Sequence, residues 1–319
     1  MDCPVCENPD TLPCYRMGDR FFGTTREEFT LNRCPSCGLL FLEEGLVEKQ
    51  LKAFYPPGYW WSEQGPYGKL ERRYREWMVS SDQLRFVSRV LQPLAGLQLL
   101  DIGCGSGTFV RMARRAGVEA VGLELSREAV AIAEKEAPGA VMEGSEEKIL
   151  EQGRVYDVVT LFHSLEHMTS PFHFLKKLRR ILKAEGSLIV QVPNAGSIQA
   201  RVFGSRWVGL DCPRHLYNYT SLALLHLLGR AGYRIRVVRH FSLRDNAAAI
   251  VSSLFPVLDP MSSRVKRARQ HSPLPASFRS MADGMYFLLL WVAQPLALAE
   301  AALGRGGTLT VWATVEKRR

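Results

Sequence analysis

The segment Leu99 to Phe109, with the sequence LLDIGCGSGTF, carries the clearest chemical pattern in the chain. An apolar run leads to Asp101, and glycines follow at positions 103, 105 and 107. A strand that turns directly into a helix needs positive φ values, which glycine tolerates, and a backbone without Cβ atoms lets a ligand lie against it. The string G-C-G-S-G departs from the six-residue dinucleotide fingerprint. It therefore predicts a site for a ligand other than NAD.

A second acid, Glu124, ends the apolar segment VEAVGLEL at residues 118 to 125. It follows the glycines by about 20 residues, which is the interval that a strand-helix-strand unit imposes. A carboxylate at the end of this next strand accepts hydrogen bonds from the hydroxyls of an adenosine ribose. Asp101 and Glu124 together predict a cofactor that contains a nucleoside.

These residues resemble motif I and the following strand of class I methyltransferases that depend on S-adenosylmethionine (SAM). The resemblance implies that the glycine loop holds the methionyl part of SAM, that Asp101 anchors its amino end, and that the adenine lies near Glu143 to Glu146. An unrelated Rossmann-type domain without SAM is the alternative. The cofactor-binding residues implied in this way are Asp101, Gly103, Cys104, Gly105, Gly107, Glu124, Leu125, Ser145, Phe162 and His163.

A cluster of acid and histidine follows the expected fourth strand, where open α/β folds bind ligands. The sequence FHSLEHM holds His163, Glu166 and His167, and His215 comes later, in GLDCPRHLYNYT. The cluster resembles the E-x-x-E-H metal motif of ubiquinone-pathway and small-RNA O-methyltransferases. It also resembles the E-H pair of nucleotide-sugar C-methyltransferases, which supplies a general base and accompanies an N-terminal zinc ribbon.

Methyl transfer requires that the nucleophile be positioned and deprotonated, and a neutral imidazole suits that task. We therefore predict that His167 is the base, that Glu166 orients it, and that His215 lies near the acceptor. His163 replaces the first motif glutamate, which weakens binding of a hard cation but leaves zinc or iron open. In the alternative interpretation, His163 and His167 only frame the pocket.

The identity of the acceptor is constrained by Phe162 to Leu165, which stand where amine-directed enzymes carry N-P-P-aromatic. By resemblance, this difference disfavours DNA-amine and protein-glutamine methylation. A hydroxyl or carbon of a small, sugar-linked or lipid-linked molecule remains. One alternative is an RNA methyltransferase that uses the ribbon and the basic C-terminal third. Another is a non-catalytic SAM-binding or membrane-docked partner protein.

Two C-P-x-C units open the chain, and their cysteines are Cys3, Cys6, Cys34 and Cys37. Paired units of this kind suit four thiolates around Zn²⁺, and a site closed by four thiolates is structural, not catalytic. A segment this short buries little core, so the metal would contribute most of its folding free energy. Disulfides or free thiols are the alternative, which a reducing compartment disfavours.

Strands and helices alternate along the middle of the chain, which predicts an α/β, Rossmann-like sheet with helices on both faces. By resemblance, the last strand lies antiparallel between two others, as in class I methyltransferases. The expected strands are 98–102, 119–123, 140–142, 157–162, 187–192, 234–241 and 308–315, and the expected helices are 108–115, 127–137, 171–182 and 220–230.

The expected organisation has five parts. Residues 1–45 form a zinc ribbon, 46–95 an aromatic linker and a helix, 96–242 the SAM-binding domain, 243–306 a helical insertion, and 307–319 the last strand and tail. The aromatic run FYPPGYWW at 54–61 either closes over the SAM pocket or packs on the domain.

Charge is unevenly distributed along the 319 residues, which carry a net charge of +9. Residues 1–200 hold 24 Lys and Arg against 26 Asp and Glu, whereas residues 201–319 hold 17 against 6. This asymmetry indicates a polyanion, an anionic membrane surface or a phosphorylated substrate, with a solvated basic face as the alternative. The opening MDCPVCENPD lacks a signal-peptide pattern, which predicts a cytoplasmic protein.

The insertion at 243–306 is too long for a hairpin loop. Its apolar stretches, 247–258 and 285–303, lie on either side of basic residues, and the second stretch is interrupted by Gln294, Pro295 and Glu300. We therefore expect a helical hairpin in the cytoplasmic interface of an anionic membrane, not a spanning helix. A buried cap or a dimerisation surface is the alternative. The basic residues are Arg264, Lys266, Arg267, Arg269 and Arg279.

Overall fold

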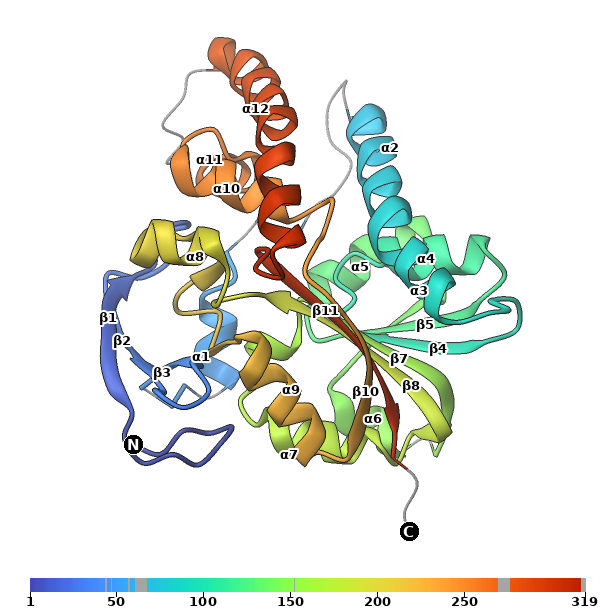
Figure 1. Ribbon diagram of the computed structural model, residues 1–319. Coiled ribbons are helices and arrows are strands. Elements are labelled where there is room, and N and C mark those ends of the chain that lie inside the picture. The colour runs from blue at the N-terminus through green and yellow to red at the C-terminus, as the bar shows by residue number, and fades with distance from the viewer. Residues whose placement is uncertain are drawn as a thin grey trace.

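A twisted sheet forms the centre of the molecule in the computed structural model, which describes residues 1–316 apart from 44, 47, 57, 61–67, 152 and 269–275 (Figure 1). Within these residues the sheet has seven strands in the order β10-β11-β8-β7-β4-β5-β6. Their bounds are β4 (Gln98–Ile102), β5 (Glu119–Glu124), β6 (Val141–Glu143), β7 (Tyr156–Phe162), β8 (Leu182–Pro193), β10 (Tyr233–Arg239) and β11 (Thr308–Val315).

The strand β11 is last in the sequence but lies inside the sheet. It pairs antiparallel with both β8 and β10, whereas β4, β5, β6, β7 and β8 pair in parallel. This arrangement confirms the expected Rossmann-like class I methyltransferase sheet. The register places Asp101 opposite Thr160 of β7 and Gly122 of β5, so the motif acid sits at the carboxyl end of the central strands.

Two apolar cores cover the two faces of this sheet, because neighbouring strand residues point to opposite sides. Leu99 packs with α2 to α5, whereas Leu100 packs with α7 and α9. The predicted helix at 171–182 is shorter than expected, because its chain turns after Leu178 into β8. The helices are α2 (Gly68–Val79), the π-helical η1 (Ser80–Leu84), α3 (Arg85–Val90), α4 (Thr108–Arg115), α5 (Arg127–Glu136), α6 (Glu146–Glu151), α7 (Pro171–Leu178) and α9 (Ser221–Arg230).

The N-terminal ribbon forms a second sheet in the order β1-β2-β3-β9, followed by α1 (Glu48–Ala53). Its fourth strand comes from far along the chain, which the sequence did not predict. Thr220 next to that strand donates a hydrogen bond to the carbonyl oxygen of Cys37 at 2.6 Å. The ribbon is therefore built into the rest of the molecule. The strands are β1 (Leu12–Gly18), β2 (Glu28–Arg33), β3 (Leu40–Leu42) and β9 (Tyr217–Asn218).

A buried arginine, Arg214, joins the ribbon to the loop that follows β8. Its guanidinium donates to both carboxylate oxygens of Asp19, at 2.8 and 2.9 Å, and to Asp211 at 2.6 Å. It also lies 4.5 Å from the centre of the Phe22 ring. Between β8 and β9 the chain forms α8 (Ile198–Phe203) and the short helices η3 (Gly204–Arg206) and η4 (Val208–Leu210).

The described part of the insertion before β11, which omits 269–275, contains three helices where the sequence predicted a hairpin of two: α10 (Asn246–Leu254), α11 (Pro260–Ala268) and α12 (Ala276–Ala302). The helix α12 starts before the predicted apolar stretch and continues through Pro295. Glu300, which interrupts the apolar stretch, is buried, and its carboxylate accepts hydrogen bonds from Gln199 and from the amide of Gly307. By length and composition, Met281–Ala302 could cross a membrane.

We expect Asp19→Ala to lower the free energy of unfolding by about 3 kcal/mol, because it leaves the buried Arg214 charge with one carboxylate partner fewer. Chemical denaturation measures this change. The matched control is Glu28→Gln, which removes the surface ion pair with Arg16, whose side chains are 77% and 56% exposed. That change should cost less than about 1 kcal/mol. Equal losses in the two variants would contradict the role given to Arg214.

Candidate functional site

The glycine loop connects β4 to α4 in a conformation that demands glycine. Gly103, Gly105 and Gly107 have φ values of 73°, 56° and 73°. A Cβ on Gly103 would lie 2.6 Å from the Cβ of Ser164, so the loop approaches the start of the acid-histidine cluster closely. Cys104 points away from that cluster, because its sulfur fills the space beside Gly122 of β5. The loop thus forms a backbone cradle at the carboxyl end of the sheet.

Asp101 is a buried carboxylate at the edge of this cradle, with 2% of its surface exposed. It accepts a hydrogen bond from the Thr160 hydroxyl at 2.7 Å. Burial outweighs that bond and raises the pKa of Asp101 to about 7. A carboxylate desolvated in this way is stabilised by a cation placed beside it. The ammonium group of SAM would fit that requirement.

Glu124 ends β5 and closes the other side of the cradle. Its two carboxylate oxygens accept hydrogen bonds from the amides of Gly105 and Ser126, at 2.9 and 2.8 Å. Burial raises the pKa of Glu124, although the two hydrogen bonds act to lower it. A carboxylate can accept about four hydrogen bonds, so the amides orient Glu124 and leave lone pairs for two ribose hydroxyls. The fixed Glu124 and the bare glycine backbone fit the nucleoside half of SAM.

The remaining predicted cofactor residues lie after β5, after β6 and at the end of β7. Leu125 is 47% exposed just after β5, and the Ser145 hydroxyl donates to Glu147. The Phe162 ring packs edge-on against Phe109 of α4, with ring centres 4.7 Å apart. Glu146 was also predicted to lie near the adenine, but its side chain is outside the part of the chain that the structure describes.

An aromatic segment lies over the glycine loop, and its described residues are Tyr55, Pro56, Gly58, Tyr59 and Trp60. A Cβ on Gly105 would come within 3.0 Å of the Trp60 ring, and the Tyr55 and Trp60 rings are parallel, with centres 6.4 Å apart. The Tyr55 hydroxyl lies 3.1 Å from Nδ1 of His167. This segment therefore contacts both the cofactor cradle and the histidine cluster. Trp61, the last ring of the predicted aromatic run, is outside the described residues.

His163 follows β7 with a φ of 56°, an uncommon backbone conformation for a residue other than glycine. Its Nε2 lies 3.0 Å from Oδ2 of Asp245, and its Nδ1 lies 3.4 Å from Oε1 of Glu166. Burial alone would lower the pKa of His163, but the two acids raise it to about 9. His163 is therefore a cation near neutral pH, held between two carboxylates.

Glu166 is almost completely buried, at 1% exposure, in a short helical turn. Its Oε1 faces Nδ1 of His163 and, at 4.0 Å, Nε2 of His215. Burial would raise the pKa of Glu166, but the surrounding histidines lower it. Glu166 thus lies closer to His163 than to His215, whereas the sequence predicted that it orients His167.

His167 is oriented by the backbone of another loop. Its Nδ1 lies 2.9 Å from the carbonyl oxygen of Arg214, an acceptor that fixes the proton on Nδ1 and leaves the Nε2 lone pair available. Burial and the nearby His215 lower the pKa of His167 to about 4. The rings of His167 and His215 are 4.7 Å apart, centre to centre. His167 is therefore a neutral imidazole at physiological pH.

The structure brings together three ligand atoms in this cluster. One from each of Glu166, His167 and His215 lie within 4.8 Å of one another, which is close enough to hold a metal ion. His215 is oriented by its Nδ1, 2.8 Å from the carbonyl oxygen of Gly209. The cationic His163 is not part of this group.

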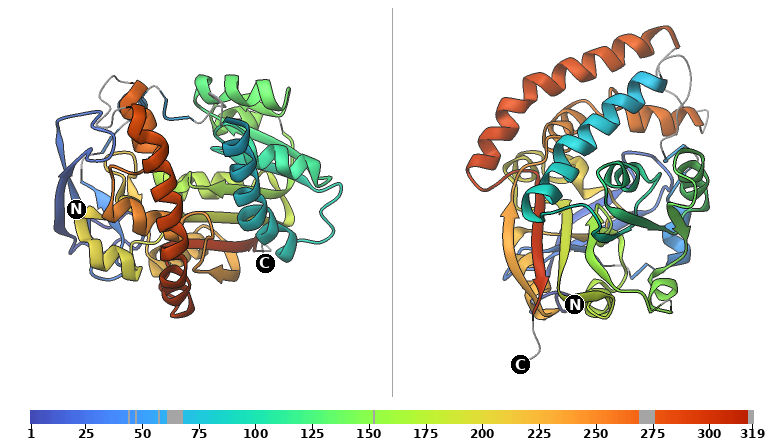
Figure 2. Two further views of the ribbon diagram at one scale, coloured as in Figure 1. Left: turned by 90° about the horizontal axis from the view of Figure 1, so that it is seen from above. Right: turned by 90° about the vertical axis from the view of Figure 1, so that its right-hand side faces the viewer.

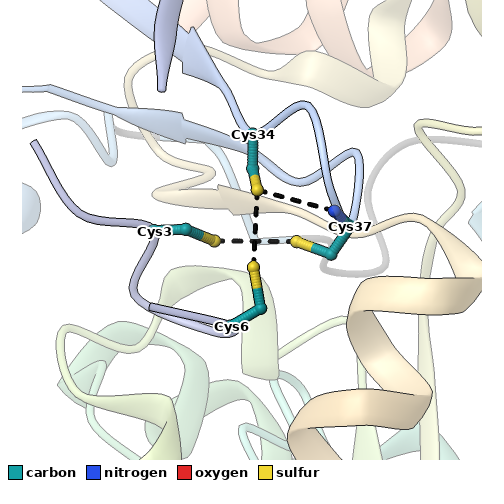
Figure 3. Close-up of side chains that lie close together, drawn as sticks. All are labelled: Cys3, Cys6, Cys34 and Cys37. Atoms are coloured by element: carbon teal, nitrogen blue, oxygen red, sulfur yellow. Dashed lines mark hydrogen bonds between the residues drawn. The ribbon is translucent and has the colours of Figure 1, made fainter. Parts of the chain in front are cut away.

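The four predicted ribbon cysteines converge on one point (Figure 3). The sulfurs of Cys3 and Cys37 are 3.6 Å apart, and those of Cys6 and Cys34 are 3.4 Å apart. Bonds of about 2.3 Å in a tetrahedron would separate sulfurs by about 3.8 Å, so the cluster fits a zinc ion. The hydrogen bond with Cys37 lowers the pKa of the Cys3 thiol to about 5. All seven cysteines of the chain are free thiols.

Sequence reasoning missed two residues that shape this site. Asp245 binds His163 from 82 residues away, and Arg214 supplies the carbonyl oxygen for His167 from 47 residues away. The basic, proline-containing loop CPRH gave no signal of a buried role. Asp245 lies in an expected insertion, where no motif distinguished it from other polar residues.

Comparison with known proteins finds methyltransferases. A family model described as a methyltransferase domain matches residues 70–238. The ubiquinone biosynthesis O-methyltransferase of Cereibacter sphaeroides is 26% identical over 190 residues, which cover 54% of this chain and 76% of that protein. The protein of the same name from Xanthomonas oryzae is 27% identical over 168 residues, covering 50% and 67%. A solved SAM-dependent methyltransferase from Archaeoglobus fulgidus is 16% identical, with a TM-score of 0.49, over 78% of this chain and all of that chain.

The four-sulfur geometry leads us to expect that the purified protein carries a zinc ion, which elemental analysis would detect. Cys34→Ser should lose the metal and lower the thermal unfolding midpoint, because zinc binding contributes to the folding free energy of the ribbon. Cys14→Ser, in the same ribbon but outside the cluster, is the matched control and should keep the metal. Zinc retained in both variants would rule out this site.

Proposed function

Because this chain belongs to the methyltransferase domain family and is a SAM-dependent methyltransferase, we propose that it methylates a hydroxyl or a carbon of a small, sugar-linked or lipid-linked acceptor. The observation that carries the proposal is the position of a neutral, oriented imidazole, His167, in the cluster beside the cofactor cradle. We also propose that Zn²⁺ in the four-cysteine cluster is structural, because four thiolates leave no open position for chemistry.

In this proposal the chain positions the cofactor from two sides. Asp101 pairs with the ammonium group of SAM, Glu124 accepts from its ribose hydroxyls, and Gly103 and Gly105 let it approach the backbone. Trp60 and Tyr55 cover the cradle and exclude water from the reacting atoms. SAM, when bound, supplies the methyl group on an activated sulfonium.

The acceptor proton is assigned to Nε2 of His167. His163 cannot take it near neutral pH, because its paired acids keep it protonated. His167 is uncharged there, and the Arg214 carbonyl oxygen directs its free lone pair to Nε2. The lowered pKa keeps the imidazole neutral and able to accept a proton, but it also makes His167 a weak base, so the acceptor hydroxyl or carbon must itself be acidified. Glu166, with His215, supports the positive charge that then develops.

A divalent ion held by Glu166, His167 and His215 is the second candidate for this cluster, and their mutual distances favour it. Such an ion would hold an acceptor oxygen and lower its pKa. A chelator distinguishes the two candidates. If a divalent ion is needed, the chelator abolishes methyl transfer without unfolding the protein, whereas a reaction that uses His167 as the base does not need the ion.

We expect His167→Gln to keep S-adenosylhomocysteine binding and to reduce methyl transfer by at least about 100-fold. Transfer is measured as incorporation of radiolabelled methyl into a panel of nucleotide sugars and isoprenoid phenols. Asp101→Ala is the complementary variant and should lose cofactor binding in isothermal titration. Transfer confined to RNA or to amine acceptors, or full activity in His167→Gln, would refute the proposal.

Cofactor affinity should rise with pH up to about pH 7 and then level off. Binding of an ammonium group favours ionised Asp101, whose pKa in the free protein is raised to about 7, so binding releases a proton below that pH. The dissociation constant of S-adenosylhomocysteine should therefore fall by up to about tenfold per pH unit below pH 7. In Asp101→Asn the affinity should be weaker and should change less with pH. The same slope in both proteins would assign the titration to another group.

A further inference from the structure

The helix α12 exposes a continuous apolar surface. Trp291 is 72% exposed, Val292 64% and Leu296 63%. Monomeric soluble proteins rarely leave large apolar side chains exposed together along one helix, and such patches mark interaction sites. We call this surface the α12 apolar face; it consists of Met281, Met285, Leu288, Trp291, Val292 and Leu296.

The opposite side of α12 is packed and bonded. Tyr286, Leu290 and Ala297 are buried against α10, and the Tyr286 hydroxyl lies 3.1 Å from the hydroxyl of Ser252. Gln294 donates to the carbonyl oxygen of Leu243 at 3.2 Å. Figures 1 and 2 show α12 rising beyond the sheet on the same side as α2. The helix is therefore anchored along one side and apolar along the other.

The charges next to the α12 apolar face are mostly basic, although the exposed Asp283 lies between Met281 and Met285. No charged residue occurs between Asp283 and Glu300. Between Asp259 and Asp283 the chain holds five Lys and Arg and no acid. The helix α2 contacts α12 through the rings of Tyr74 and Phe287 at 5.1 Å, and its described side chains include Arg72, Arg73 and Arg75 against one acid, Glu76. The segments that adjoin the apolar face thus carry a net positive charge.

We propose that the α12 apolar face lies in the headgroup region of an anionic lipid bilayer, parallel to its surface. An apolar helix face bordered by Lys and Arg has the chemistry of an interfacial helix. The helix does not span the bilayer, because spanning would pull Gln294 and Tyr286 from their partners and expose the buried Glu300 to lipid. A second copy of the chain would bring its own basic segments against these, whereas anionic headgroups neutralise them.

The helices α10 and α11, which belong to the same insertion as α12, connect to the histidine cluster and to the aromatic segment. Asp245, which binds His163, is the residue just before α10. Arg264 of α11 donates to the carbonyl oxygens of Gly58 and Tyr59, at 2.8 and 3.0 Å. A bilayer against α12 is therefore one helix layer from the site. This position favours an acceptor whose lipid tail stays in the membrane, an inference that rests on the proposed function. The docking itself does not depend on the reaction.

Co-sedimentation of the full chain with vesicles tests the docking. We expect binding to vesicles of phosphatidylglycerol and phosphatidylcholine that weakens with added salt and is much weaker on phosphatidylcholine alone. Leu288→Glu combined with Trp291→Glu should reduce binding by at least about tenfold. Leu222→Glu, at a site 59% exposed on α9, is the matched control and should bind as the wild type does.

Binding of S-adenosylhomocysteine, measured on each variant, shows that the fold and the cofactor site are intact, so that a docking failure is separate from a failure of the proposed function. Equal vesicle binding by the double variant and the wild type would overturn the proposal. A second result would also overturn it: the wild type does not bind vesicles and sediments as a dimer, whereas the double variant sediments as a monomer. The α12 apolar face would then be covered by a second copy of the chain.

Discussion

The buried ion pair between Arg214 and Asp19 is the contact on which the rest of the site depends. The Arg214 side chain is held by the ribbon acid Asp19 and by Asp211, while its own carbonyl oxygen orients His167. A buried charge is tolerated only when its partners are in place. The ribbon thus contacts Arg214 through Asp19, and the carbonyl oxygen of the same arginine sets the direction of the His167 imidazole.

The two histidines of FHSLEHM lie four residues apart and carry opposite protonation states. His163 is kept charged by Asp245 and Glu166, whereas His167 is kept neutral by burial and by a carbonyl acceptor. The acid of the motif, Glu166, lies 3.4 Å from His163, so its charge acts on that histidine at short range. Where the surroundings of two titratable groups shift their pKa values in opposite directions, one group commonly acts as the acid and the other as the base. The insertion contributes to this division through Asp245.

Local patterns predicted much of the fold and the cofactor site. The strands around Asp101 and Glu124, the glycine loop and the cysteine pairs could be found because each is encoded within a few neighbouring residues. Contacts between distant segments could not be found, since neither β9 nor Asp245 carries a local signature. Glu300 interrupts the apolar stretch of α12 in the sequence, but its carboxylate is bound by Gln199 and Gly307, which a single sequence does not reveal. The roles of the individual site residues stay predictions.

The position of β11 has a consequence for biosynthesis. Because β11 lies between β8 and β10, the edge of β8 that faces away from β7 has no strand partner until residues 308–315 have left the ribosome. These residues are synthesised after the whole insertion. An unpaired, apolar edge strand is a template for aggregation. During that interval the apolar side chains of α12 are also already present. A nascent chain stalled within the insertion would therefore be a client for chaperones, not merely an inactive enzyme.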